Sequence, residues 1–158
     1  MVKFKDNSKF QKKNNFKLRF AKINDAVFLF RIYNNNVREN TNFNNKPITF
    51  KNHIIWLLEK IKKKSIYIIY IEKPIGYIRL DQIDKKKISI SIAMKNNYKK
   101  KGIAKKALFK VINKKKMKKK IFIASIKKTN KVSQNFFTNF GFKKIKNTEN
   151  YILKKTHE

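Results

Sequence analysis

The segment "NYKKKGIAKKAL", Asn97–Leu108, combines residue types that could bind a phosphate group. Gly102-Ile103-Ala104 lies where a strand pattern gives way to a helical one. The first turn of a helix has unpaired N–H groups and the positive end of the helix dipole, and both attract anions. Glycine also permits close approach to the backbone. We therefore expect a diphosphate site, although a glycine at a helix start also occurs without a ligand. Its residues would be Lys99, Lys100, Lys101, Gly102, Ile103, Ala104 and Lys105.

Polar side chains also fall within two predicted strands. In "GYIRLD", Tyr77, Arg79 and Asp81 share one face, and Ser89 and Ser91 share a face of "KISISIAM". Such side chains could line a cleft in the middle of the sheet, or they could face water at its edge. The chain has only 9 Asp and Glu residues, so few carboxylates could accept a proton during catalysis.

The composition excludes several classes of protein. A chain of 158 residues suggests one domain, and 41% hydrophobic residues can build a core. Without cysteine there is no disulfide or thiolate metal site, and with 2 histidines we expect no zinc or other metal. Apolar runs stay short of the ~20 residues of a membrane span, and the first residues lack a signal-peptide core. We therefore expect a cytoplasmic protein that does not contact membranes.

The formal net charge is +33, from 42 Lys and Arg against 9 Asp and Glu. Such a charge would attract nucleic acid. However, the excess is lysine, and it accompanies many Asn, Ile and Phe, which AT-rich codons encode. Arginine, the residue that grips phosphates with a planar fork, is scarce. Because a low-GC genome explains this composition and charge runs are usually solvated, we expect nonspecific contact with nucleic acid at most.

The alternation and capping patterns predict a mixed order of strands and helices. Strands are expected over 16–23, 65–72, 74–81, 87–94, 120–126, 142–145 and 150–155. Helices are expected over 26–35, 50–64, 102–116 and 130–140, with Asp25 and Thr49 capping the first two and Gly141 ending the last. Residues 1–15 read as a flexible basic arm and 34–47 as a polar loop. The central meander is antiparallel, unlike a doubly wound sheet.

A second motif, "NKVSQNFFTNFGF", Asn130–Phe142, follows the strand "IFIASI". Together with Lys-x-x-Gly-x-Ala at 99–104, it makes the chain resemble the GNAT superfamily of acyl-CoA-dependent N-acyltransferases over Phe16–Lys155. The resemblance implies the α/β GNAT fold over residues 16–158. That fold has a mixed, mostly antiparallel central sheet of six to seven strands, about four flanking helices, and splayed fourth and fifth strands.

The same resemblance implies acetyl-CoA as cosubstrate. In this family the helix after Gly-x-Gly/Ala binds the pyrophosphate, and the pantetheine arm lies between the fourth and fifth strands. The N–H of Ile92 is the expected group that polarises the thioester carbonyl. The other coenzyme-binding residues implied in this way are Ile90, Ser91, Met94, Asn130, Ser133 and Phe137.

The chain departs from the family pattern at three positions. Lys99 replaces the usual Arg or Gln, and Lys100 replaces a frequent glycine. Lysine can neutralise a diphosphate, but as a point charge. Phe137 stands where many members have a tyrosine that protonates the leaving thiolate. Tyr98, Tyr77 or water could substitute, or the thiolate could leave unaided.

Acetyl transfer to an amine also requires removal of a proton from the amine. Asp81 is the favoured base on the residue pattern. His53 is the alternative, because its unperturbed pKa suits proton transfer. Its spacing from Trp56 and Leu57 places the three residues on adjacent turns of a helix, where a packed or capping histidine would have a structural role only.

The N-terminal half, "RIYNNNVRENTNF…ITFKNHIIWLLEKI", resembles the branch that acetylates the 4-amino group of nucleotide-linked aminosugars in pseudaminic-acid biosynthesis. On that resemblance Arg38, His53, Trp56 and Arg79 would surround the sugar nucleotide, with both arginines at its diphosphate. The related branch that modifies N-terminal amines of ribosomal proteins is an alternative. A basic nucleic-acid-binding module without catalysis is a further one, although lysines spread through every segment disfavour it. We expect a monomer or a homodimer.

Overall fold

The computed structural model describes residues 15–39 and 46–154. The predicted basic arm, 1–15, therefore lies outside the described residues except for Asn15. The elements follow one another in the predicted order. They are β1 (Lys17–Phe20), α2 (Ala26–Arg38), α3 (Phe50–Lys62), β2 (Ile66–Tyr70), β3 (Pro74–Gln82), β4 (Lys87–Met94), α4 (Ile103–Ile112), β5 (Ile121–Ser125), α5 (Lys131–Phe140), β6 (Lys143–Lys144) and β7 (Asn150–Lys154).

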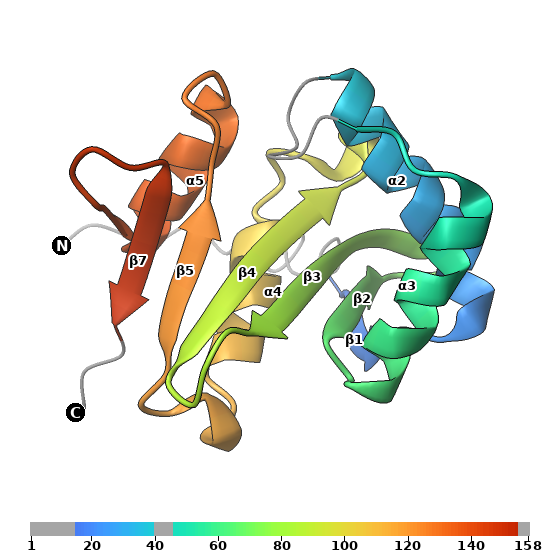
Figure 1. The fold of residues 1–158 in the computed structure, drawn as a ribbon, viewed down its shortest axis with the longest axis horizontal. Helices are drawn as coiled ribbons and strands as arrows, with labels where there is room; N and C mark the ends of the chain where they lie inside the picture. The colour runs from blue at the N-terminus through green and yellow to red at the C-terminus, as the bar shows by residue number, and fades with distance from the viewer. Residues whose placement is uncertain (1–14, 40–45, 155–158) are drawn as a thin grey trace, which may run out of the picture.

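The strands form one seven-stranded sheet in the order β1-β2-β3-β4-β5-β7-β6. All neighbouring strands pair antiparallel except β4 and β5, which are parallel. Helices α4 and α5 pack on one face of the sheet and α2 and α3 on the other, so the molecule has two apolar layers (Figure 1). The predicted α/β class and the mixed, mostly antiparallel sheet are confirmed.

The side-chain alternation of β4 supplies both layers. Ile88, Ile90 and Met94 are buried with α4, whereas Ala93 is buried with α2 and α3. Ser91 stands opposite Arg79 of β3 and Ser89 opposite Asp81, on the face of Ala93. The predicted polar patch therefore exists, and it faces α3.

Strands β4 and β5 separate along their length. Their register contains only Lys87↔Ile121, Ile88↔Phe122 and Ser89↔Ile123, although β4 continues to Met94 and β5 to Ser125. Figure 1 shows the two strands diverging beyond this pairing. The predicted splay of the fourth and fifth strands is therefore present, and it leaves main-chain groups of β4 open to a ligand.

Three local expectations need correction. Helix α2 continues to Arg38, because the Asn-rich segment keeps a helical backbone and the N–H of Glu39 still bonds Asn35. Asp25 precedes α2 but does not cap it; its carboxylate accepts the N–H of Lys22 and two bonds from Arg19, at 2.7 to 2.8 Å. In α3 Thr49 caps the helix as predicted, whereas the helix expected over 102–116 ends at Ile112.

Candidate active site

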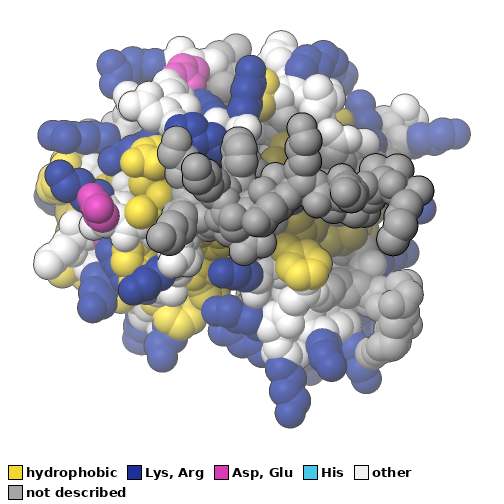
Figure 2. All heavy atoms as spheres, turned by 180° about the vertical axis from the view of Figure 1, so that it is seen from behind, with side chains coloured by type: hydrophobic (Ala, Val, Ile, Leu, Met, Phe, Trp, Pro, Cys, Tyr) yellow, Lys and Arg dark blue, Asp and Glu magenta, His cyan; other side chains and the backbone are white. Residues whose placement is uncertain are grey.

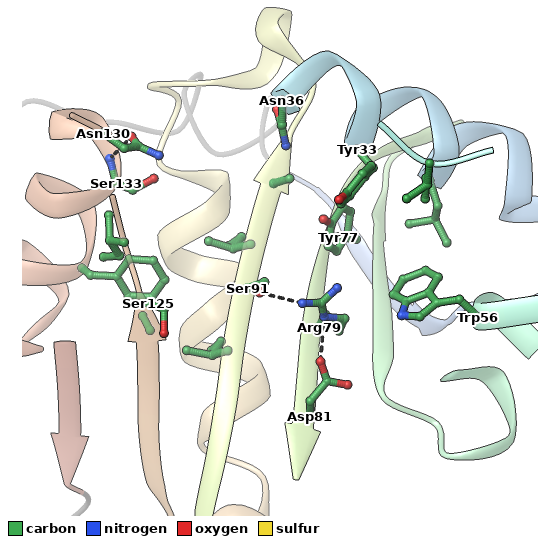
Figure 3. A pocket seen from close by; sticks show the side chains of 18 of the residues that line it. Tyr33, Asn36, Trp56, Tyr77, Arg79, Asp81, Ser91, Ser125, Asn130 and Ser133 are labelled. Atoms are coloured by element: carbon green, nitrogen blue, oxygen red, sulfur yellow. Dashed lines mark hydrogen bonds and ion pairs between the residues drawn. The ribbon is translucent and has the colours of Figure 1, made fainter. Parts of the chain in front are cut away.

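One cavity of about 530 Å³ passes through the opening between β4 and β5. This volume is in the range of small-molecule sites. On one side of the sheet its wall comes from α2, α3 and β3, and on the other side from β5 and α5. The lining residues used below are Tyr33, Asn36, His53, Trp56, Tyr77, Arg79, Asp81, Ile90, Ser91, Ile92, Ser125, Asn130, Ser133 and Phe137 (Figure 3).

Hydrogen bonds at both ends of the β3–β4 ladder establish which main-chain groups face the opening. The N–H of Ile83 bonds the carbonyl of Lys87, and the N–H of Lys95 bonds the carbonyl of Ile75. Because an antiparallel ladder alternates, Ser91 and Ala93 direct their N–H groups to β3, and Ile92 directs its N–H away from β3 toward β5. The β4–β5 register ends before Ile92. Its N–H is therefore available to a group inside the opening, as the prediction requires.

The helix start at Gly102 has a left-handed backbone. Gly102 has φ 73° and Lys100 has φ 59°, a region that glycine occupies without strain and lysine does not. A Cβ added to Gly102 would have no heavy atom within 4 Å, so the space beside this residue is open. Lys100, Lys101 and Lys105 are exposed around it. This geometry fits an anion at the first turn of α4.

The start of α5 lines the cavity on the side of the sheet opposite α2 and α3. The side chain of Asn130 caps the helix by accepting the N–H of Ser133 at 3.0 Å. Phe137, one turn further, is buried and makes an edge contact with Phe142 at a centroid distance of 4.9 Å. Because Phe137 has no hydroxyl, α5 offers no phenol here. Tyr77 lines the cavity from β3, and burial raises the pKa of its phenol, so that it stays protonated at neutral pH.

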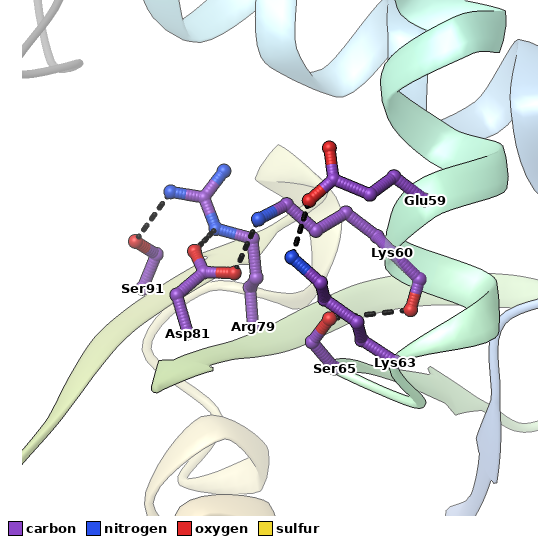
Figure 4. A network of polar contacts seen from close by, with 7 residues as sticks. All are labelled: Glu59, Lys60, Lys63, Ser65, Arg79, Asp81 and Ser91. Atoms are coloured by element: carbon purple, nitrogen blue, oxygen red, sulfur yellow. Dashed lines mark hydrogen bonds and ion pairs between the residues drawn. The ribbon is translucent and has the colours of Figure 1, made fainter. Parts of the chain in front are cut away.

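The polar patch on β3 is a charged network (Figure 4). The Nε of Arg79 lies 2.8 Å from Oδ2 of Asp81, and the Nζ of Lys60 lies 2.6 Å from Oδ1. A terminal nitrogen of Arg79 donates to the hydroxyl of Ser91 at 3.3 Å, and the guanidinium lies over the ring of Trp56 at 5.6 Å. Both oxygens of Asp81 thus face a cation, and this arrangement opposes a role as proton acceptor.

His53 is buried with 1% exposure and contacts the rings of Phe30, Phe50 and Trp56. Its Nε2 lies 2.9 Å from the carbonyl oxygen of Ala26. An imidazole that donates from Nε2 keeps its lone pair on Nδ1, and within the described residues Nδ1 has no hydrogen-bond partner. Burial lowers the pKa of His53, so the ring is neutral at neutral pH. Of the two predicted bases, His53 is the one whose acceptor atom, the buried Nδ1, has no cation beside it.

Some predicted site residues lie elsewhere. Arg38 is exposed at the end of α2 and bonds Asn35 at 2.6 Å, so it does not join Arg79. Met94 and Ile103 are core residues; Met94 packs opposite Gly76, where an added Cβ would clash with its sulfur. Lys99 contacts Glu39 at 3.5 Å.

Sequence reasoning did not identify four polar residues near the cavity: Tyr33, Asn36, Lys60 and Ser125. Tyr33 and Asn36 are three residues apart and therefore lie on one face of α2, a spacing that could have indicated them. Lys60 carries no signal in a chain so rich in lysine.

Comparison with known proteins assigns the fold to a family. The model of the acetyltransferase (GNAT) family matches residues 29–142, which include β4, α4 and the cavity-lining part of α5. The chain belongs to the acetyltransferase (GNAT) family. It is accordingly an N-acetyltransferase that uses acetyl-CoA as cosubstrate.

Solved structures with the same fold have low sequence identity. The chain is similar to yncA of Salmonella typhimurium, solved with its cofactor acetyl-CoA, at 18% identity with a TM-score of 0.74, covering 91% of this chain and 96% of the other. It is also similar to a ribosomal-protein-alanine N-acetyltransferase of Brucella melitensis, at 19% identity and a TM-score of 0.68 over 87% and 96% of the two chains.

A third similar structure is the Microcin C7 self-immunity acetyltransferase MccE with acetyl-CoA and AMP, at 18% identity and a TM-score of 0.68 over 89% and 92% of the chains. None of the curated proteins matches this sequence.

Residues 15–39 and 46–154 lack two kinds of feature. This part of the chain contains no group of three or more His, Cys, Asp or Glu side chains that could hold a metal ion. It also contains no helix that is both long and apolar enough to cross a membrane.

Proposed function

We propose that this N-acetyltransferase acts on the amine of a nucleotide-linked aminosugar. The observation that carries the proposal is the pair formed by Arg79 and Trp56 in the cavity wall, on the side of the sheet opposite α4 and α5. The indole can stack on a ring, and the guanidinium can bind a phosphate oxygen. In the similar structure of MccE a nucleotide, AMP, is bound together with acetyl-CoA.

The coenzyme is proposed to enter from the side of α4 and α5. Its pyrophosphate would bind at the first turn of α4, where Gly102 leaves open space and Lys101 and Lys105 add charge. The pantetheine arm would lie in the opening beside Ile90 and Ser91. The N–H of Ile92 would then donate to the thioester carbonyl and stabilise the charge that develops on its oxygen.

In the reaction, the acceptor nitrogen bonds to the carbonyl carbon and the C–S bond breaks. We propose that the amine proton passes to Nδ1 of His53 and then to water, while the leaving thiolate takes a proton from water. A general base contributes typically 10²–10⁴-fold to rate. His53→Gln should therefore lower kcat at least about 100-fold with little change in the affinity for acetyl-CoA. An unchanged kcat would remove His53 from the mechanism.

The direct test is thiol release from acetyl-CoA with a panel of UDP-4-aminosugars and N-terminal peptides. Acetylation of the sugars is the expected result. Turnover of peptides alone would replace the proposal with the protein-amine alternative, the activity named for the similar Brucella melitensis protein.

The nucleic-acid hypothesis gains no support from the surface. Lysine and arginine side chains are scattered over the visible part of the face in Figure 2 and do not form a single stripe. Several lie over aromatic rings of the chain itself, as Lys114 does over Tyr67 at 4.2 Å, so these ring faces are covered. A salt titration of DNA binding should show no affinity above that for nonspecific competitor.

A further inference from the structure

The network around Asp81 contains more positive than negative charge. Asp81 contributes one negative charge, and Lys60 and Arg79 contribute two positive charges. The side chains of Lys60, Arg79 and Asp81 are 15%, 26% and 26% exposed, so water screens them only in part. A group that binds to this wall of the cavity meets one uncompensated positive charge.

Arg79 is the cation of the network that faces the cavity. Its Nε forms an ion pair with Asp81, and its Nη2 donates a hydrogen bond to Ser91. The ring of Trp56 covers one side of the guanidinium. Figure 3 shows the guanidinium between Ser91 and Trp56. Nη1 makes no hydrogen bond or ion pair with the described residues, so it can donate to a ligand.

Lys60 acts on Arg79 through Asp81. It comes from α3, whereas Asp81 and Arg79 come from β3, so the network joins the helix to the sheet. With Lys60 present, Asp81 cannot neutralise Arg79 completely, because each of its two carboxylate oxygens lies beside a different cation. Without Lys60 the remaining pair would be electrically neutral, and the carboxylate could turn and draw the guanidinium from its place beside Trp56.

We infer that the acceptor of this enzyme carries an anionic group, a phosphate or a carboxylate, which binds Arg79, and that Lys60 and Asp81 are positioning residues for that guanidinium. The inference rests on the proposed function for the location of the acceptor. It goes further in defining an anionic group as the requirement and in giving Asp81 a role other than proton transfer.

Trp56 makes this site observable, because it is the only tryptophan of the chain. Its fluorescence can be titrated with uridine diphosphate as the phosphate, succinate as the carboxylate and uridine as the uncharged control, with saturating coenzyme A occupying the other phosphate site. We expect at least one of the two anions to bind more tightly than uridine, and the tighter one identifies the anionic group. Equal affinity for uridine and uridine diphosphate, with no response to succinate, would overturn the inference.

Variants on α3 test the role of Lys60. Lys60→Met should weaken anion binding about tenfold. It removes the hydrogen bond from Lys60 to Asp81, and hydrogen bonds between charged groups are stronger than those between neutral groups. Lys60→Arg should restore it. Lys63→Met is the matched control, because Lys63 is the C-cap residue of α3 and its ion pair is with exposed Glu59, not with Asp81. If Lys60→Met binds the anion as the wild type does, Lys60 is not a positioning residue.

Steady-state kinetics separates this inference from the proposed function. For an acetylated acceptor, Lys60→Met should raise KM and leave kcat nearly unchanged, and Asp81→Asn should do the same without altering the pH profile. If no aminosugar is acetylated while the anions still bind beside Trp56, the aminosugar proposal fails and the inference stands. If an aminosugar is acetylated with a KM that Lys60→Met does not change, the proposal stands and the inference fails.

Discussion

The two sides of the cavity are built from different kinds of groups. On the coenzyme side, the ligand would meet main-chain N–H groups of Ile92 and of the first turn of α4, exposed by a strand splay and a left-handed glycine. On the acceptor side it would meet side chains, chiefly Arg79, Trp56 and His53. Main-chain groups survive most substitutions, whereas side chains do not. Chains with 18–19% identity share this fold, and likeness of fold leaves the acceptor undefined.

The largest effect is expected from removing Arg79, the cation on the acceptor side. Arg79→Met should lower kcat/KM for an anionic acceptor about 100-fold, because truncating one partner of a desolvated charge pair costs about 2–5 kcal/mol. The affinity for acetyl-CoA should stay unchanged in calorimetry. Arg31→Met, at an exposed position of α2, is the control. An equal loss of coenzyme affinity would show that the two sides are not independent.

The coenzyme side can be changed through the backbone alone. Gly102→Ala leaves space for the Cβ but strains the backbone at φ 73°, at a cost of about 1–2 kcal/mol. If the first turn shifts to relieve that strain, acetyl-CoA should bind about five- to tenfold more weakly, with the acceptor KM unchanged. Gly141→Ala, at φ 111° after α5, is the matched control. Both variants should lose thermal stability, and only the first should lose coenzyme affinity.

The buried histidine of the acceptor side should make stability depend on pH. Burial lowers the pKa of His53 in the folded state. Above about pH 6.5 neither state binds the proton, so the contribution of the neutral ring is complete. As the pH falls below that value, the unfolded chain takes up a proton that the folded chain resists, and the free energy of unfolding decreases by up to about 1.4 kcal/mol per pH unit.

Urea titrations between about pH 7 and pH 5.5 would measure this slope, in a range where carboxylates contribute little. His53→Phe should reduce the slope. A slope that persists in His53→Phe would place its origin elsewhere.

The smallest expected effect is at Lys100. A φ of 59° strains a lysine by about 1 kcal/mol. Glycine removes this strain, but it also increases the entropy of the unfolded chain, and this offsets part of the gain in stability. Lys100→Gly should therefore raise the free energy of unfolding by about 0.5 kcal/mol. Lys101→Gly, beside it but without a positive φ, should lower the stability. Thermal melts of the two variants would measure both changes in stability. An equal loss of stability in both variants would show that the backbone of Lys100 is not strained.

Much of the fold follows from local patterns. The alternation in "KISISIAM" predicts the two faces of β4, and Thr49, Asn130 and Gly141 mark helix ends that the structure confirms. The end of α2 was not predictable in this way, since asparagine is typical of loops yet continues the helix to Arg38. Because of this extension, Arg38 lies at the exposed end of the helix and not in the expected site.

By itself, the sequence determined the order of elements, the faces of the strands, the glycine that opens α4 and the family to which these belong, because each depends on neighbours a few residues apart. The tertiary structure alone decided which charges meet. Lys60 and Asp81 are 21 residues apart, and nothing in the sequence distinguishes Lys60 from other lysines until α3 packs against β3. Charge pairing between separate elements depends on distance in space, and no local pattern records that distance.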